Sequence, residues 1–529
     1  MRRVHRVDSP VKEQSLTQTR LTSTDQNERP LASLGRLLVL AGLALYAVSA
    51  PHSVAGAAIA SGFAGLGWLL RILGSGSIGL RRSKFDLPIL LLLLWTVASS
   101  LLSAEPQISV PKLQALWSVF LFYLVRAAVT KRWAVLLVGL LIVSGSVGSL
   151  YSIYDLVRGR GVVVDTLSPD SPLRRIGIQV HDAIWRVDGR RIYSLSQLDE
   201  ALRNAPTDRP ISVSVISQGE HVERNSLILS AAEQMTTSPS GLKGTNRSHR
   251  FRASGWTRHY ETFAELLQMI AQLTLGIALA NLRNHGANRY FRLAIAVAAL
   301  LTVGIALTAM RTVVVAFVVG ASLISWRSLR GRSKIVFTFA LFFVLGVAAV
   351  VVWQTRAQRA LSLSDPSSLL RAQVARVGLT RILLHPVFGH GMDAMKKHWS
   401  EWGFPGKDML HLHSTPLQLA FDRGLPALLI WLWLMGAFWL HIARAETHSR
   451  DMSDTMSFGI LLGLLGALTG FLCSSVVNYN FGDAEVAMLF WYLMGIAMVV
   501  SETTSEGCMT EGKAGAPRPT SVAGPPPLH

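Results

Sequence analysis

The fold of this chain is constrained most by a series of apolar runs, each long enough to cross a lipid bilayer. A transmembrane helix needs about 20 apolar residues to span the hydrocarbon core. Half of the 529 residues are hydrophobic, and the mean hydropathy of +0.37 is too high for a soluble protein of this size. The sequence therefore predicts an all-α polytopic membrane protein with about 12 transmembrane helices. We place the runs near residues 35–50, 54–72, 87–103, 111–129, 133–155, 261–282, 291–309, 312–326, 335–353, 416–442, 457–476 and 485–501.

The distribution of lysine and arginine orients these helices. The short loops "PHS" and "AEPQIS" contain no basic residue, whereas the alternate connections are basic. Cytoplasmic loops carry such an excess, so we predict a multi-pass protein of the inner (cytoplasmic) membrane with both termini in the cytoplasm. The net charge of +19 follows this pattern rather than a nucleic-acid-binding face, and we expect no nucleic-acid partner. The basic connections are 71–84, 126–132, 283–292, 327–334 and 444–450.

This orientation divides the chain into membrane, cytoplasmic and external segments, the last lying in the periplasm of a Gram-negative cell. The predicted segments are a cytoplasmic tail (1–33), membrane helices 1–5 (34–155), a periplasmic domain (156–235), a periplasmic linker (236–260), membrane helices 6–9 (261–353), a periplasmic catalytic loop (354–415), membrane helices 10–12 (416–501) and a disordered cytoplasmic tail (502–529).

Residues 161–229 interrupt the membrane pattern with short β-rich runs, turn signals and the amphipathic helix "LSQLDEAL". The run "SPDSPLRRIGIQVHDAIWRVDGRRI" resembles the PDZ family, whose members bind peptide C-termini by strand addition and hold the carboxylate in a glycine-rich loop. Only "LVRGRG" precedes Val162 where that loop is expected. We predict a small α+β PDZ-like domain, either a module that binds a periplasmic protein or a packing module. The matching residues are Ser171, Pro172, Gly177, Asp182, Ile184 and Gly189, with His181 in place of the family's usual Gly.

A polar cluster stands at the entrance of the tenth predicted helix, in "HLHSTPLQLAFDRGLP" (411–426). His413 has the chemistry of a general base at neutral pH, and His411 is its nearest competitor. Pro416 suits the first turn of a helix, whose N-terminus favours an anion. The alternative for His413 is a histidine that a backbone carbonyl satisfies at the helix entry.

Arg311 lies between two apolar runs on the predicted outer side, against the positive-inside trend. A charge in such a place is costly and is usually functional. Its planar fork of donors suits phosphate. The alternative is an arginine that extends to the lipid headgroups.

The run "HPVFGHG … HLHSTPLQLAFDRGLPALLIWL" resembles the O-antigen ligase and polymerase superfamily, marked by a "P..G.G" turn and then "HN.YL…E.G..G" leading into a membrane helix. "LTAMRTVVVAF" resembles the family's "T.SRG..L", and "RASGWTRHYETFAELLQMI" resembles the segment that opens the middle membrane block of its ligases. This chain has Ser414 for the usual Asn and Pro416 where an aromatic is common. The matching positions are His413 on the family's histidine, Leu417 and Gln418 on "YLQ", Asp422 on the acid, Gly424 on the glycine and Arg311 on the arginine.

The resemblance implies His413 and Arg311 as catalytic residues and a glycan on a polyprenyl diphosphate as donor. The candidate substrate-binding residues are Arg371, His411, Gln418, Asp422 and Asp483. Arg371 shares a five-residue spacing with Arg376 and Arg381 and can face lipid phosphates or water. Asp483, beside Glu485, can orient the histidine or the acceptor or belong to a solvated loop.

Four polar residues share one face of the sixth predicted helix by their spacing of three to four. We interpret them as helix–helix hydrogen-bonding groups rather than as reactive ones. They are Glu261, Glu265, Gln268 and Gln272.

The sequence indicates no metal or cofactor. Its external histidines lack acids at ligand spacing, and the absence of an HExxH motif excludes an intramembrane zinc protease with a PDZ domain. Cys473 and Cys508 support neither a disulfide framework nor a thiolate metal site.

We therefore predict a polyprenyl-diphosphate-dependent glycosyltransferase that carries a glycan from undecaprenyl diphosphate to an acceptor at the outer face of the membrane. O-antigen ligation to lipid A core is the favoured reaction. An O-antigen or exopolysaccharide polymerase and a protein O-oligosaccharyltransferase are the alternatives. From another class, the alternative is a non-enzymatic membrane scaffold or transporter that uses the PDZ-like domain.

Overall fold

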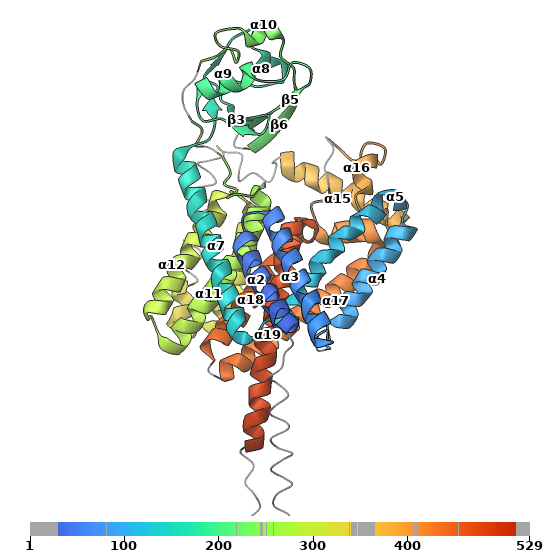
Figure 1. Cartoon of the computed structure of the whole chain (residues 1–529), viewed down its shortest axis with the longest axis vertical. Helices are drawn as coiled ribbons and strands as arrows, with labels where there is room; N and C mark the ends of the chain where they lie inside the picture. Colours follow the sequence, from blue (N-terminus) through green and yellow to red (C-terminus); the bar gives the residue numbers. More distant parts are fainter. Residues whose placement is uncertain are drawn as a thin grey trace, which may run out of the picture.

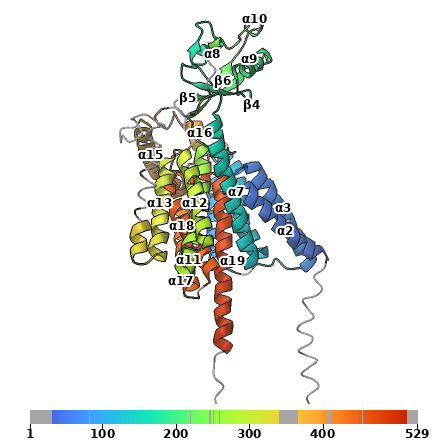
Figure 2. The same cartoon turned by 90° about the vertical axis from the view of Figure 1, so that its left-hand side faces the viewer.

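The chain folds into a helical bundle with a small strand-containing unit at one end (Figures 1 and 2). The computed structural model describes residues 30–80, 82–217, 220–243, 247–249, 251–257, 259–337, 339, 346, 366–406, 411–452 and 454–514. The first half of the bundle comprises α2 (Pro30–Ser49), α3 (Val54–Ser75), α4 (Asp86–Leu102), α5 (Pro106–Ser109), η1 (Val110–Val119), α6 (Phe120–Ala128) and α7 (Lys131–Arg158). The second half comprises α11 (Tyr260–His285), α12 (Arg289–Leu307), α13 (Arg311–Ser328), α15 (Pro366–Leu384), α16 (Ala394–His398), α17 (Thr415–Asp451), α18 (Thr455–Ser475), η2 (Asn480–Gly482) and α19 (Ala484–Ala514).

Ten helical stretches among the described residues are long and apolar enough to cross a membrane, and α4 is a shorter apolar helix. These eleven coincide with eleven of the predicted runs, which supports a multi-pass membrane protein. The remaining run, 335–353, lies almost entirely outside the described residues. The run predicted at 111–129 is not one regular helix, because a ten-residue 3₁₀ segment, η1, stands between α5 and α6. Helix α19 continues past residue 502, where we predict the C-terminal tail to begin.

The strand-containing unit lies between α7 and α11. Strands β1 (Val162–Val163), β3 (Ala183–Val187), β5 (Ile211–Ser217) and β6 (Glu220–Leu227) form an antiparallel sheet in that order, and β4 (Arg190–Arg191) pairs with β3. A second pair joins β2 (Thr166–Leu167) and β7 (Leu242–Lys243). Helices α8 (Pro172–Arg175), α9 (Leu195–Arg203) and α10 (Ala231–Gln234) complete the unit, which has an apolar core of its own.

Several PDZ-like motif residues occupy turns in this unit. Ser171 caps α8 through its side chain, and the Asp182 carboxylate accepts a hydrogen bond from the backbone N–H of Gln179 at 2.9 Å. His181 has a φ of 74°, a left-handed conformation in which glycine is the least strained residue.

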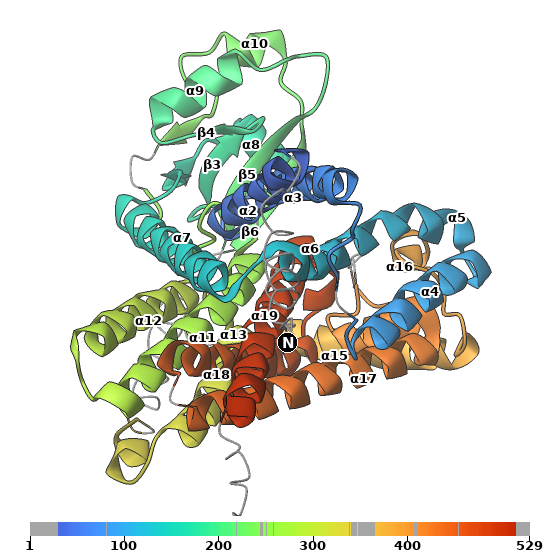
Figure 3. The same cartoon turned by 60° about the horizontal axis from the view of Figure 1, so that its bottom comes forward.

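Helices α11 and α18 pack closely in the centre of the bundle. A side chain at Gly276 of α11 would overlap the backbone of Gly463 in α18. Small residues permit such close contact where lipid provides no hydrophobic driving force between helices. Figure 3, which is tilted so that the bottom of the bundle comes forward, shows the pairs α2–α3 and α4–α17 around this centre.

Helix α17 breaks at Gly424, which has φ 82° and ψ 170°. A break leaves backbone carbonyls of the preceding turn without helical partners. The turn before α16 satisfies two of them, because the N–H groups of His390 and Gly391 donate to the carbonyls of Phe421 and Asp422 at 2.8 and 3.0 Å. The indole N–H of Trp95 in α4 donates to the carbonyl of Arg423 at 2.9 Å.

The same break explains why two separated glycine motifs occur together. The N–H of Leu425 donates to the carbonyl of Pro386 at 2.7 Å, and a Cβ at Gly424 would overlap the carbonyl group of Val387. A Cβ at Gly389 would likewise collide with the backbone of Asp422. The "P..G.G" turn and the glycine of α17 therefore form one backbone unit.

We predict that Gly424→Ala destabilises the protein. The backbone conformation of Gly424, essentially restricted to glycine, alone costs another residue about 1–3 kcal/mol, and the overlap with Val387 adds to it. Gly436→Ala in the same helix is the matched control, because nothing lies within 4 Å of a Cβ there. Thermal unfolding of the detergent-solubilised variants should give a lower Tm for the first only, and equal Tm values would contradict this account of the break.

Candidate active site

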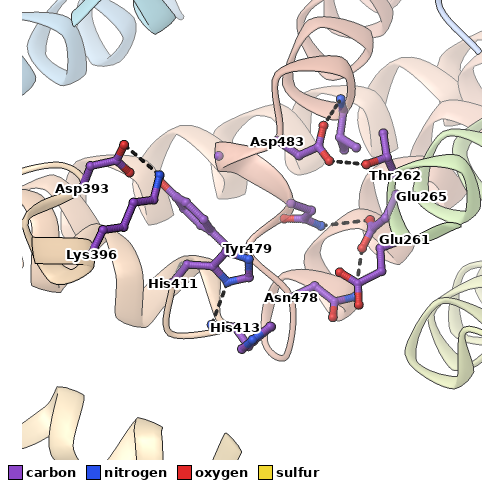
Figure 4. Close-up of a pocket in the computed structure, with 13 residues that line it drawn as sticks. Glu261, Thr262, Glu265, Asp393, Lys396, His411, His413, Asn478, Tyr479 and Asp483 are labelled. Carbon is purple, nitrogen blue, oxygen red and sulfur yellow. Dashed lines mark hydrogen bonds and ion pairs between the residues drawn. The ribbon is translucent and has the colours of Figure 1, made fainter. Parts of the chain in front are cut away.

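A cavity of about 240 Å³ lies where α11, α17 and α19 begin. Figure 4 shows two histidines of this cavity between Lys396 and Asp393 on one side and Glu261 and Glu265 on the other. Of the predicted site residues, the structure places three in the lining, namely His411, His413 and Asp483.

The two histidines precede α17 and are fixed by local backbone geometry. Ser414 caps the helix with its hydroxyl, and His413 adopts a left-handed conformation with φ 52°. The N–H of His413 donates to Nδ1 of His411 at 3.2 Å, so that nitrogen of His411 carries no proton. The two rings lie edge to face with centroids 4.3 Å apart.

The environment keeps both imidazoles neutral. Burial, followed by His411 and Arg371, lowers the pKa of His413 from 6.5 to about 3. Burial, followed by Arg371 and Lys396, lowers the pKa of His411 to about 4. At neutral pH one ring nitrogen of His413 is therefore unprotonated, as a general base requires. A substrate anion beside it would raise the pKa and strengthen the base.

Glu265 of α11, which lines the same cavity, forms the centre of a buried polar cluster. Its side chain is only 3% exposed. It accepts hydrogen bonds from the hydroxyl of Ser474 and from the side-chain amides of Asn478 and Asn480, the latter two at 3.0 and 3.2 Å. Paired in this way, a polar residue inside the bundle is stable where an unpaired one would be costly.

The cluster also positions the start of α17. The hydroxyl of Thr415 donates to Oδ1 of Asn480 at 3.0 Å, and its backbone N–H donates to the carbonyl of Asn478 at 3.0 Å. The amide of Asn478 further donates to the hydroxyl of Thr312 at 3.1 Å. We call these residues the Glu265 cluster. It joins α11, α13, α17 and α18, and its member from α17, Thr415, follows His413 by two residues. Its members are Glu265, Thr312, Thr415, Ser474, Asn478 and Asn480.

Gln418 and Asp422 lie behind the histidines rather than in this cavity. The side-chain carbonyl of Gln418 accepts from the N–H of Leu412 at 2.7 Å, and its amide donates to Asp422 at 2.8 Å. Both side chains are buried. Gln418 therefore links the carboxylate of Asp422 to the backbone of Leu412, which lies between the two histidines.

Asp483 faces the cavity, but its oxygens are already engaged. One accepts from the hydroxyl of Thr262 at 2.5 Å, and the other accepts from the first N–H groups of α19, at Glu485 and Val486. The carboxylate thus caps α19 and joins it to α11.

Neither of the two predicted arginines is in the described lining, but each lies next to a residue that lines the cavity or contacts its lining. Arg371 of α15 lies 3.9 Å from the carboxylate of Glu261, and its charge acts on both histidines. Arg311 is the first residue of α13 and is not among the described lining residues, but the adjacent Thr312 belongs to the Glu265 cluster.

Sequence reasoning missed two features of this site. The helical spacing of Glu265 and its polar neighbours predicted helix–helix hydrogen bonds. It did not predict that Glu265 lines the cavity. Lys396, in the unremarkable pair "KK", gave no signal, yet it lines the cavity and pairs with Asp393 at 2.9 Å. Within the described part of the chain, no group of three or more His, Cys, Asp or Glu residues is arranged to hold a metal ion.

These features define a polytopic membrane protein with a polar, histidine-containing cavity at one end of its bundle. Residues 296–432 match the family described as O-antigen ligase. The match covers α13, α15, α16, the two histidines and the first half of α17. It supports the O-antigen ligase superfamily and a ligase or polymerase role of the glycosyltransferase type, with a lipid-linked glycan donor and a membrane acceptor.

A second comparison finds the magnetosome formation protease MamE of Magnetospirillum gryphiswaldense. It is 31% identical over 88 residues, which are 17% of this chain and 10% of that protein. The match thus spans about a tenth of the length of this curated relative, and it carries no conclusion about activity here.

We predict that His413 does not titrate in the physiological range. Its pKa of about 3 keeps the ring neutral from pH 5 to pH 8, whereas an ordinary histidine changes charge near 6.5. The measurement is NMR of histidine-labelled protein, with the His413 signal identified by its loss in His413→Asn, since asparagine tolerates the left-handed conformation. Arg371→Gln, which removes a cation, should move the midpoint upward; a wild-type midpoint near pH 6.5 would contradict the burial argument.

Proposed function

We propose that the protein transfers a glycan from undecaprenyl diphosphate to an acceptor hydroxyl at the outer face of the inner membrane, with lipid A core as the acceptor. The observation that carries this proposal is a neutral histidine at the start of α17, in a cavity flanked by Arg371 and Lys396. A base beside cations suits a reaction in which a hydroxyl loses a proton and a diphosphate leaves.

In the proposed reaction, the acceptor oxygen attacks the anomeric carbon of the donor sugar. The bond between that carbon and the diphosphate oxygen breaks, and undecaprenyl diphosphate leaves with the electron pair. His413 takes the proton of the attacking hydroxyl, a role that contributes about 10²–10⁴-fold in enzymes. No nucleotide sugar is required, because the lipid donor already contains the activated bond.

Cations near the cavity would stabilise the charge of the leaving group. Arg311 stands at the N-terminus of α13, where the helix dipole itself favours an anion. The charge of Arg371, in α15, acts on both histidines. In this proposal Arg311 and Arg371 contact the diphosphate or its sugar, while His411 and Asp483 fix His413 and the cavity wall.

In this proposal the strand-containing unit is a periplasmic PDZ-like domain between membrane helices 5 and 6. It lies at the same end of the bundle as α15 and α16 (Figure 1). In a scaffold or transporter, deletion of 161–229 would abolish function, whereas loss of the His413 and Arg311 side chains would be tolerated. The enzyme requires both side chains.

We predict that His413→Asn, His413→Ala and Arg311→Lys each insert normally but leave the cell deficient in surface glycan. The first two variants remove a general base, which contributes about 10²–10⁴-fold to the reaction rate. The third keeps the positive charge but loses the planar set of guanidinium donors. Electrophoresis of lipopolysaccharide and of the lipid-linked glycan distinguishes a ligase from a polymerase. A ligase defect leaves full-length polymer on undecaprenyl diphosphate and a bare core, whereas a polymerase defect leaves single repeats on the core.

His285→Asn is the matched control, because that exposed histidine lies at the far end of α11. It should leave the glycan profile unchanged. A normal profile in cells that lack both His413 and Arg311 side chains, with the protein present in the membrane, would refute the catalytic assignment.

A further inference from the structure

The chain that leaves α10 of the strand-containing unit turns back along the edge of β2 before it runs to the bundle. We call residues 237–243 the returning segment. Its last two residues are β7, which pairs antiparallel with β2 and places Leu242 opposite Leu167. The backbone N–H of Ser168 donates to the carbonyl of Gly241 at 2.8 Å. Among the described strands, β7 is the one that pairs with β2. The chain therefore covers with its own backbone an edge that would otherwise present unpaired polar groups.

Helix α9 lies on the other side of the returning segment. Asp199 of α9 is only 8% exposed, and its carboxylate accepts hydrogen bonds from the N–H of Ser240 at 3.0 Å and from the hydroxyl of Ser238 at 3.3 Å. A buried carboxylate requires donors of this kind. In the part of the chain that the structure describes, both donors to Asp199 come from the returning segment. The carboxylate is thus placed to receive the backbone of an extended chain.

Two further hydrogen bonds hold backbone carbonyls of the returning segment. The guanidinium of Arg203 in α9 donates to the carbonyl of Thr237 at 2.8 Å, and the hydroxyl of Ser171 donates to the carbonyl of Ser240 at 2.5 Å. When a peptide is recognised by strand addition, main-chain hydrogen bonds give affinity and side-chain pockets give specificity. The polar contacts here are mostly of the main-chain kind.

A single apolar side chain anchors the returning segment. Leu242 is 3% exposed and belongs to the apolar core of the unit, together with Leu167 of β2 and Leu198 of α9. The residues before it are small or polar, in the run "TTSPSGLK" that begins at residue 236. The contacts of the segment are therefore those of a bound peptide with one anchor residue.

We propose that the returning segment is an intramolecular ligand of the strand-containing unit, which fills a peptide groove between β2 and α9 and closes it to other peptides. A short tether gives such a ligand an effective concentration of about millimolar, which exceeds that of any free competitor at micromolar concentration. Of the two roles that the sequence leaves open for this unit, the closed groove favours the packing module while the segment is docked. The groove accepts an extended peptide of small polar residues followed by a leucine once the segment is withdrawn. This property does not depend on the proposed reaction.

The test measures fluorescence anisotropy of a labelled peptide, TTSPSGLK, added to the full-length protein in nanodiscs. The wild-type protein should show no binding up to about 100 µM peptide, because its own segment occupies the groove. Leu242→Asp places a charge in the apolar core, so the segment should leave and the peptide, which keeps its leucine, should bind at least about tenfold more tightly. A second variant, in which glycine and serine replace residues 237–243, withdraws the same contacts without adding a charge and should behave alike.

Matched changes in α9 test the groove itself. In the Leu242→Asp protein, Asp199→Ala should weaken peptide binding about tenfold, as for loss of hydrogen bonds to a charged group. Glu200→Ala is the control, because that neighbouring side chain is exposed. A peptide with aspartate in place of leucine should not bind to either protein.

Three results would overturn the proposal. Equal peptide binding by the wild-type protein and both segment variants would place the peptide outside the groove. Absence of binding in a segment variant whose strand-containing unit still resists limited proteolysis would show that no peptide groove exists there. Proteolytic loss of the unit in both variants would show that residues 237–243 are an indispensable part of the fold rather than a ligand.

Discussion

The carboxylate of Glu265 is the point on which the geometry of the candidate site depends. It lies inside the bundle, where an unsatisfied polar group would cost several kcal/mol. Donors from Ser474, Asn478 and Asn480 satisfy it, and these come from α18 and the loop before α19. That loop in turn holds Thr415 at the first turn of α17. Because His413 precedes Thr415 by two residues, the position of the proposed base follows from this cluster.

A second constraint acts nine residues further along α17. The break at Gly424 is stable because the turn at 386–391 supplies hydrogen bonds to the carbonyls that the break releases. The break and the Glu265 cluster together fix both ends of the short helical segment 415–423. His413 precedes this segment by two residues, and Arg423 is its last residue. A rigid segment of this kind can hold the proposed base at a constant position, as catalysis requires.

The apolar runs predicted most of the bundle, since length and hydropathy identify membrane helices without tertiary information. They did not predict η1, because average hydropathy is insensitive to whether a turn closes by 3₁₀ or α hydrogen bonds. His411 and His413 could be identified from their chemistry and from the resemblance. The central place of Glu265 in the site could not be identified from the sequence, because its partners Asn478 and Asn480 are more than 200 residues away. Arg423 looked like part of a polar helix entry, and only the packing of α4 and η1 shows that it is buried.

The central claim is a direct displacement at the anomeric carbon, with His413 accepting the proton of the attacking hydroxyl. A single displacement inverts the configuration at that carbon, whereas a covalent glycosyl-enzyme intermediate would retain it through two inversions. The decisive measurement uses purified protein in vesicles, a lipid-linked glycan of known anomeric configuration and the lipid A core acceptor, with NMR of the new glycosidic bond. The account predicts an inverted configuration in a product that the His413→Asn protein does not form. A retained configuration, or an equal yield from that variant, would contradict it.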